Sequence, residues 1–84
     1  MQYSLTNEYV WKEVGDQVVI LHLDSGRYNS LNDSASLIWR GIIEKLPETE
    51  IAKRLCQLFA VDETTAKKDI SKMLQQLLEK NIIK

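Results

Sequence analysis

The fold is decided in the stretch LDSGRYNSLN, residues 23–32, where one sequence pattern gives way to another. The stretch opens with turn-forming residues, and Gly26 can adopt a positive φ angle at little cost. Residues 27–31 form a short run that includes the aromatic Tyr28, which is typical of a strand. Asn32 or Asp33 can then accept a hydrogen bond from an orphan backbone N–H and begin a helix. The stretch therefore predicts a turn, a short third strand and the start of a helix.

Two more strands are expected before this stretch. Residues 9–14 are rich in β-branched and aromatic side chains, and residues 18–23 form a compact apolar run. The pair Gly15-Asp16 between them is a turn signal. Tight turns between successive strands predict an antiparallel meander. Three strands are about the smallest stable sheet, and one face of it must be covered.

Three amphipathic helices are expected after the stretch, because apolar residues recur there at three- and four-residue spacing. Pro47 is expected to end the first helix and open the second. Asp62 is expected to cap the third helix, and Asn81 to close it before a final aliphatic pair. The apolar faces consist of Ala35, Ile38, Trp39, Ile42 and Leu46 in the first helix, Ile51, Leu55, Leu58 and Phe59 in the second, and Ala66, Ile70, Met73, Leu74, Leu77 and Leu78 in the third. The fold class is therefore α+β, with the element order of a winged helix-turn-helix.

Length and composition favour a globular protein with one domain, residues 1–84. The chain has 84 residues, of which 44% are hydrophobic and 27% charged. Its 11 basic and 12 acidic residues give a formal net charge of -1. A nucleic-acid-binding domain is usually strongly basic, so this balance speaks against nucleic acid as a partner.

The compartment is predicted from the same totals. Cys56 is the only cysteine, which excludes an internal disulfide and fits a reducing compartment. No apolar run approaches the length of a membrane span, and the N-terminus does not resemble a secretion signal. We therefore expect a cytoplasmic protein without a membrane partner.

Residues with catalytic or metal-binding chemistry are sparse. His22 is the only histidine and lies among apolar residues of the second strand, where packing explains it. Cys56 lies within an amphipathic helix, with no histidine and orienting residue arranged beside it in the sequence. A metal site needs several ligands at suitable spacing, and no such set is found. We expect no catalytic residues, no metal and no cofactor.

The stretch at residues 23–32, followed by Ala35 and the pair Ile38-Trp39, resembles the signature of the PqqD-like family. In that family a turn with Asp and Gly leads to an aromatic strand, then Leu-Asn, then a helix with Ala and an Ile-Trp pair. The end of the chain is also similar, with the step Asp69-Ile70, paired leucines and a closing aliphatic pair. A free-standing chain of this length resembles the precursor-peptide recognition elements of lasso-peptide biosynthesis.

The resemblance implies a protein without catalytic residues that binds the leader segment of a ribosomally made precursor peptide. The leader would add as a strand to the edge of the third strand and lie against the third helix. The domain would then deliver the precursor to a transglutaminase-like cysteine leader peptidase and an asparagine-synthetase-like lasso cyclase. An edge strand has unpaired backbone groups that suit this mode of binding. The candidate peptide-binding residues are Arg27, Tyr28, Asn29, Ser30, Leu31, Ala66, Asp69, Ile70, Met73 and Leu77.

Two questions remain open from the sequence. Leu31, Ile38 and Trp39 are expected in the core, whereas Met73 and Leu77 fit either the core or a peptide contact. Strict alternation separates Tyr28 and Ser30 from Arg27, Asn29 and Leu31, without showing which set faces the core. The alternative function is a winged-helix DNA-binding regulator, which would require a basic recognition helix; the third helix has mixed charge.

Overall fold

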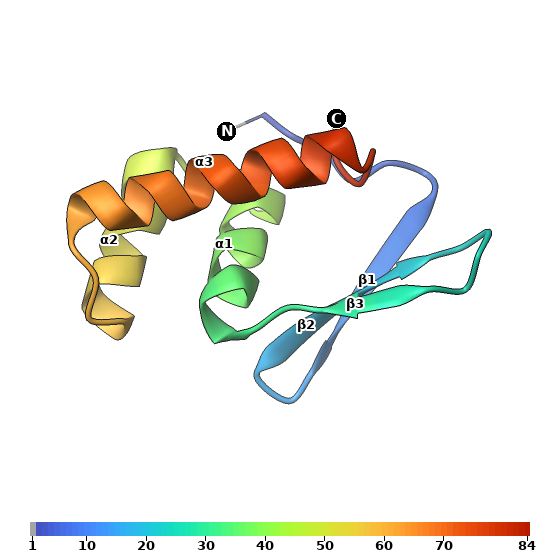
Figure 1. Cartoon of the computed structure of the whole chain (residues 1–84), viewed down its shortest axis with the longest axis horizontal. Helices are drawn as coiled ribbons and strands as arrows, with labels where there is room; N and C mark the ends of the chain where they lie inside the picture. Colours follow the sequence, from blue (N-terminus) through green and yellow to red (C-terminus); the bar gives the residue numbers. More distant parts are fainter. Residues whose placement is uncertain (1) are drawn as a thin grey trace.

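In the computed structural model, which describes residues 2–84, a small sheet is followed by three helices (Figure 1). The elements are β1 (Tyr9–Val14), β2 (Gln17–His22), β3 (Tyr28–Ser30), α1 (Asp33–Ile43), α2 (Glu48–Leu58) and α3 (Glu63–Glu79). The strands pair antiparallel in the order β1-β2-β3, so β1 and β3 are edge strands. The predicted α+β class and the order of its elements are confirmed.

The register of β3 shows which of its side chains face the helices. Asn29 pairs with Ile20, and Ile20 is only 2% exposed. Directly paired residues of an antiparallel sheet point to the same side. Asn29 therefore lies on the helix-facing side, whereas Tyr28 and Ser30 lie on the opposite face. This resolves the alternation that the sequence left open.

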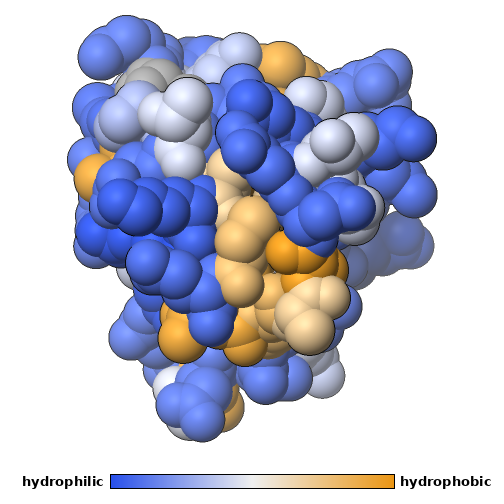
Figure 2. Space-filling model, turned by 90° about the vertical axis from the view of Figure 1, so that its left-hand side faces the viewer, coloured by the Kyte–Doolittle hydropathy of each residue, from blue (hydrophilic) through white to orange (hydrophobic). Residues whose placement is uncertain are grey.

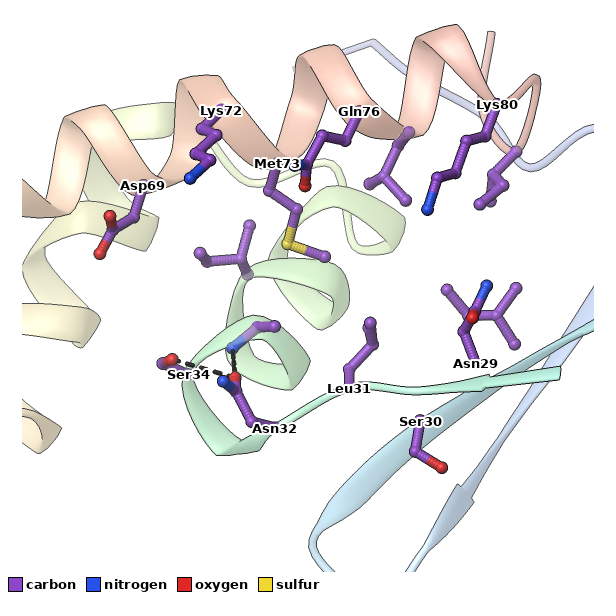
Figure 3. Close-up of a pocket in the computed structure, with 15 residues that line it drawn as sticks. Asn29, Ser30, Leu31, Asn32, Ser34, Asp69, Lys72, Met73, Gln76 and Lys80 are labelled. Carbon is purple, nitrogen blue, oxygen red and sulfur yellow. Dashed lines mark hydrogen bonds between the residues drawn. The ribbon is translucent and has the colours of Figure 1, made fainter.

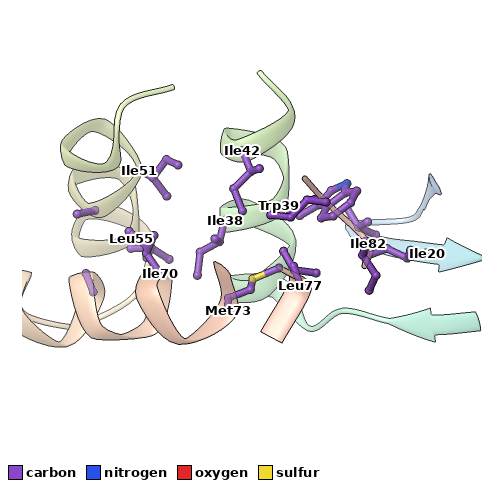
Figure 4. Close-up of a cluster of buried hydrophobic side chains, with 14 residues drawn as sticks. Ile20, Ile38, Trp39, Ile42, Ile51, Leu55, Ile70, Met73, Leu77 and Ile82 are labelled. Carbon is purple, nitrogen blue, oxygen red and sulfur yellow. The ribbon is translucent and has the colours of Figure 1, made fainter. Parts of the chain in front are cut away.

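The core lies between the three helices and the inner face of the sheet (Figure 4). Trp39 of α1 is fully buried and meets the Trp11 ring edge-on, with ring centroids 6.0 Å apart. Gly41 permits a close approach of α1 and α2, because a Cβ added there would lie 2.6 Å from Cγ1 of Ile51. Ile38 and Trp39 are buried as expected, and Leu31 packs against the core while staying partly exposed.

Two leucines assigned to the apolar faces lie on the surface. Leu58, the last residue of α2, is 70% exposed, and Leu78 of α3 is 42% exposed. Figure 2 shows the end of the molecule where α2 lies, with a strip of apolar side chains between hydrophilic ones. Spacing along a helix identifies apolar faces, but it does not reveal where the neighbouring element ends. A place on an apolar face therefore does not mean that these two residues are buried.

The ends of α1 and α3 share one backbone motif. Lys45 and Asn81 have φ angles of 61° and 58°, and each follows directly on the helix C-cap. After α1, the Leu46 N–H donates to the Gly41 carbonyl at 2.9 Å. This left-handed residue with its backward hydrogen bond is the Schellman motif. The motif ends α1 at Ile43, so the expectation that the first helix continues through Leu46 to Pro47 is wrong; the predicted closure of α3 by Asn81 is confirmed.

The two chain ends meet beside α3. Leu5 and Ile83 form an antiparallel bridge, and Ser4 and Lys84 exchange backbone hydrogen bonds of 2.9 Å in both directions. The Thr6 hydroxyl donates to the Asn81 carbonyl at 2.8 Å. This pairing holds the segment after α3 in place. Within residues 2–84, no helix is long and apolar enough to cross a membrane.

Candidate functional site: a groove between β3 and α3

A groove of about 480 Å³ runs between β3, the start of α1 and the second half of α3 (Figure 3). Its floor is apolar, and its rim on the α3 side is polar and charged. The lining residues are Ile20, Asn29, Ser30, Leu31, Asn32, Ser34, Ala35, Ile38, Asp69, Lys72, Met73, Gln76, Leu77, Lys80 and Ile82.

The backbone of β3 leaves a row of unpaired groups at the border of this groove. The Leu31 N–H donates to the Val18 carbonyl at 2.8 Å, so this position of β3 bonds to β2. Bonded and unbonded positions alternate along an antiparallel strand. The backbone of Asn29 therefore faces β2, while the N–H and C=O groups of Tyr28 and Ser30 point away from the sheet. These outward groups are what an added strand needs.

Ser36 fixes the position of β3 relative to α1. Its hydroxyl is fully buried, accepts a hydrogen bond from the Val18 N–H at 2.9 Å and donates one to the Leu31 carbonyl at 3.2 Å. One turn earlier, the Asn32 side chain caps α1 by accepting from the Ala35 N–H at 2.9 Å. The free edge therefore ends at a rigid junction. Ser36 was not among the predicted site residues, although a serine on the apolar face of a helix is a signal of such a bond.

The floor of the groove belongs to the core. Met73 and Leu77 are 9% and 5% exposed, and both belong to the buried cluster. Figure 3 shows the Met73 side chain pointing from α3 into the space above Leu31. The two alternatives for Met73 are therefore not exclusive, because its side chain packs in the core and also lines the groove.

The rim of the groove is a row of exposed side chains on α3. Asp69 lies at one end and Lys80 at the other, with Lys72 and Gln76 between them (Figure 3). Lys72, Gln76 and Lys80 follow one another at four-residue spacing, so they share one side of the helix. These three residues were not predicted as part of the site. Their spacing next to Met73 and Leu77 is the signal that identifies them.

The structure separates the candidate peptide-binding residues into three groups. Ala66 and Ile70 are fully buried and do not line the groove, so direct contact with a peptide stays a prediction for these two residues. They share a helix face with Met73, but their stretch of α3 is covered by α2. Arg27 and Tyr28 line a neighbouring hollow rather than the groove itself. The groove is lined by the remaining six candidates, Asn29, Ser30, Leu31, Asp69, Met73 and Leu77.

His22 and Cys56, the two residues considered for catalytic chemistry, take part in contacts within the fold. The His22 ring stacks at a tilt on Tyr9, with centroids 4.8 Å apart, and its Nδ1 lies 2.8 Å from the Ser25 hydroxyl. Cys56 is half-buried on α2. Among residues 2–84, no group of three or more His, Cys, Asp or Glu side chains is placed to hold a metal ion.

The sequence and the fold of this chain are similar to those of known proteins. Residues 17–83 match the sequence model of the family described as "Coenzyme PQQ synthesis protein D (PqqD)". The chain is similar to a solved structure described as "TbiB1 in Complex with the TbiA(beta) Leader Peptide", with 30% identity over 95% of this chain and 93% of that chain and a TM-score of 0.82. It is also similar to "Lasso peptide synthetase B1 complexed with the leader peptide", with 26% identity over 100% of this chain and 99% of that chain and a TM-score of 0.88. No curated protein matches the sequence significantly.

Proposed function

Because this chain belongs to the PqqD family, we propose that residues 1–84 form one peptide-recognition domain that binds a leader peptide in lasso-peptide biosynthesis. The observation that carries the proposal is the free edge of β3 beside a groove with an apolar floor. Both similar structures are described as complexes with a leader peptide. The groove of this chain has the features that such a ligand requires.

Strand addition would supply both affinity and selectivity. The outward N–H and C=O groups of Tyr28 and Ser30 would pair with the leader backbone, whatever the leader's sequence. An apolar leader side chain would rest on Met73 and Leu77, and burial of its surface would contribute about 25 cal/mol per Å². Alternate leader residues point to opposite faces, so those facing α3 would be selected by the groove.

We propose that the domain acts as an adaptor in the cytoplasm and carries out no reaction itself. A leader held in the groove would leave the following core peptide accessible to enzymes. The expected partners are a transglutaminase-like leader peptidase and an asparagine-synthetase-like cyclase. The domain would raise the local concentration of precursor at these enzymes, as linked binding modules do.

The binding test is a titration with the leader segment of the cognate precursor peptide. The fluorescein-labelled leader should bind with a Kd between nanomolar and micromolar, or about -12 to -8 kcal/mol. The TbiA(beta) leader serves as a second probe and reports how far selectivity extends. If folded protein at tens of micromolar does not change the anisotropy of the first probe, the proposed function is wrong.

The adaptor role is tested by separating binding from processing. The purified chain alone should leave the mass of the precursor unchanged. Adding the expected leader peptidase and cyclase should give cleaved and cyclised product, and omitting the chain should slow that conversion. Cleavage or cyclisation by the purified chain alone would contradict a purely adaptor role.

A further inference from the structure

A second hollow continues the groove beyond the start of β3. Its volume is about 730 Å³, and it shares Asn29 and Lys80 with the groove. It lies against the ends of β1 and β2 and the turn that leads into β3, and Tyr9, His22, Arg27 and Tyr28 contribute to its lining. A strand that follows the edge of β3 past Tyr28 would therefore enter this hollow.

The charge of the hollow differs from that of the whole chain. Arg27 and Lys80 line it, and no Asp or Glu does. Among residues 2–84, neither of these cations takes part in an ion pair, whereas Arg40, Arg54 and Lys67 each pair with a glutamate. The chain has a formal net charge of -1, so two unpaired cations in one hollow are a local departure from the average.

The acidic residues nearest in sequence do not neutralise these cations. Glu8, next to Tyr9, accepts a hydrogen bond of 2.8 Å from the Asn81 side chain and does not line the hollow. Asp24, in the turn before β3, does not line it either. A carboxylate in the hollow would thus meet two cations with no competing anion among the lining residues.

The walls of the hollow are fixed by contacts within the chain. The Tyr9 hydroxyl donates to the Lys80 carbonyl at 3.2 Å, which joins β1 to the end of α3. The Tyr9 ring stacks on His22, whose Nδ1 lies 2.8 Å from the Ser25 hydroxyl. The left-handed turn at Asn81 closes α3 immediately after Lys80 and sets where that side chain leaves the helix. The Arg27 carbonyl accepts a hydrogen bond from the His22 N–H at 2.8 Å, so both cations extend from backbone positions that are held by hydrogen bonds.

The groove and the hollow together form one path along α3, and the length of this helix gives the distance between the two charged ends of the path. Asp69 and Lys80 are eleven residues apart on α3, which corresponds to about 16 Å along a helix axis. An extended peptide rises about 3.3 Å per residue, so roughly five of its residues span this distance. One end of the path is acidic at Asp69, and the other is basic at Lys80 and Arg27.

We propose that this hollow is a second subsite, which takes an Asp or Glu side chain of the same peptide that lies in the groove. The acidic residue would lie about five positions from the leader residue that faces Asp69, with the apolar anchor between them. The inference rests on the proposed function and deepens it, because it assigns a charge pattern to the leader. It also separates two contributions to leader affinity. One is apolar burial on Met73 in the groove, and the other is charge pairing in the hollow.

The test is a mutant cycle on both partners. The probe is the fluorescein-labelled, C-terminally amidated leader of the cognate precursor peptide, in its natural form and with every Asp and Glu changed to Asn and Gln. The protein variant is Arg27→Gln/Lys80→Gln, and the matched control is Lys12→Gln/Lys68→Gln, two exposed cations that line neither the groove nor the hollow. Melting temperatures confirm that the variants are folded.

Two exposed charge pairs predict that the double variant binds the natural leader roughly threefold to tenfold more weakly than the wild type does. The neutralised leader should show the same loss on the wild-type protein and no further loss on the double variant. The control should bind as the wild type does. Equal affinity of wild type and double variant for the natural leader would overturn the subsite and leave the proposed function intact. Failure of the wild type to bind that leader would overturn both.

A crosslinking variant locates the subsite independently of affinity. Asn29→p-benzoylphenylalanine places a photoreactive ring on the helix-facing side of β3, at an exposed residue that lines both the groove and the hollow. Mass spectrometry of the crosslinked leader should find the attachment within one or two residues of an Asp or Glu. Attachment to a segment without an acidic residue would contradict the proposal even if the double variant bound weakly.

Discussion

The two halves of α3 share one apolar face and have different roles. In the first half, Ala66 and Ile70 are fully buried against the α2 side of the core. In the second half, Met73 and Leu77 continue the same face, but they form the floor of a groove. Figure 1 shows why: α2 runs beside the start of α3, whereas the end of α3 extends past α1 toward the sheet.

This comparison shows that a binding surface arises where a covering element is missing. The apolar face of α3 is continuous, and α2 covers only the part nearest to it. Strand β3 approaches the rest of that face with its free edge, so an added strand would complete both the sheet and the cover of α3. Substitutions in the closed half should therefore affect folding, and substitutions in the open half should affect binding.

The largest effect is expected for Ile70→Ala in the closed half. Removing a fully buried side chain leaves a cavity and should lower the free energy of unfolding by about 2–5 kcal/mol. Leader affinity, measured at a temperature where the variant is still folded, should stay within about twofold of the wild type. Chemical denaturation and anisotropy titration measure the two quantities. A tenfold loss of affinity in folded Ile70→Ala would show that the two halves are not separate.

Met73→Ala should affect both quantities, because Met73 lies at the boundary between core and groove. We expect leader binding to weaken by about 1–3 kcal/mol, the range of an anchor residue at an interface. The melting temperature should also fall, since the side chain is only 9% exposed. Leu78→Ala, at a residue of the same helix that does not line the groove, is the matched control and should change neither by much. A Met73→Ala variant with normal affinity would place the leader elsewhere.

The edge of β3 gives a sharper contrast between adjacent residues. Ser30→Pro removes an N–H that points away from the sheet, so it should weaken leader binding roughly threefold to tenfold, the value of one net hydrogen bond. Asn29→Pro removes an N–H that faces β2, so it should mainly lower the melting temperature. Ser30→Ala and Asn29→Ala keep the backbone donors and serve as controls. The opposite result would mean that the leader does not pair with this edge.

The sequence predicted those features of the fold that depend on neighbouring residues. The caps at Asn32 and Asp62 and the closure at Asn81 were all predicted correctly, because each depends on one side chain or one backbone angle. The end of α1 was not, because Lys45 takes a left-handed angle that a lysine rarely adopts. Local pattern thus gave the order of the elements, and it failed where a residue adopts an unusual conformation.

The candidate site was predicted only in part, for a different physical reason. Periodicity shows that Ala66, Ile70, Met73 and Leu77 share a face, but it cannot show which of them another helix covers. That depends on the length and position of α2, which are properties of the packed chain. The sequence also did not predict that Arg27 and Lys80 line one hollow. These residues are 53 positions apart and come to the same hollow only in the folded chain.

The smallest effects should separate two aspartates of α3, one at its N-cap and one on the groove rim. Asp62 caps the closed half, and the hydrogen bond that its carboxylate accepts from the Thr65 N–H lowers its pKa. A lowered pKa in the folded state means that ionisation stabilises the fold above the pKa of the unfolded chain, and that this contribution is lost as the pH falls through the folded value. Asp62→Ala should therefore lower the melting temperature by roughly 5 °C at pH 7, and the difference from wild type should narrow in acid.

Asp69→Ala, on the groove rim, should instead weaken leader binding by about threefold and leave the melting temperature almost unchanged. Melting curves between pH 3 and pH 7, with titrations at pH 7, measure both variants; an Asp69→Ala variant that melts early but binds normally would assign this carboxylate to the fold.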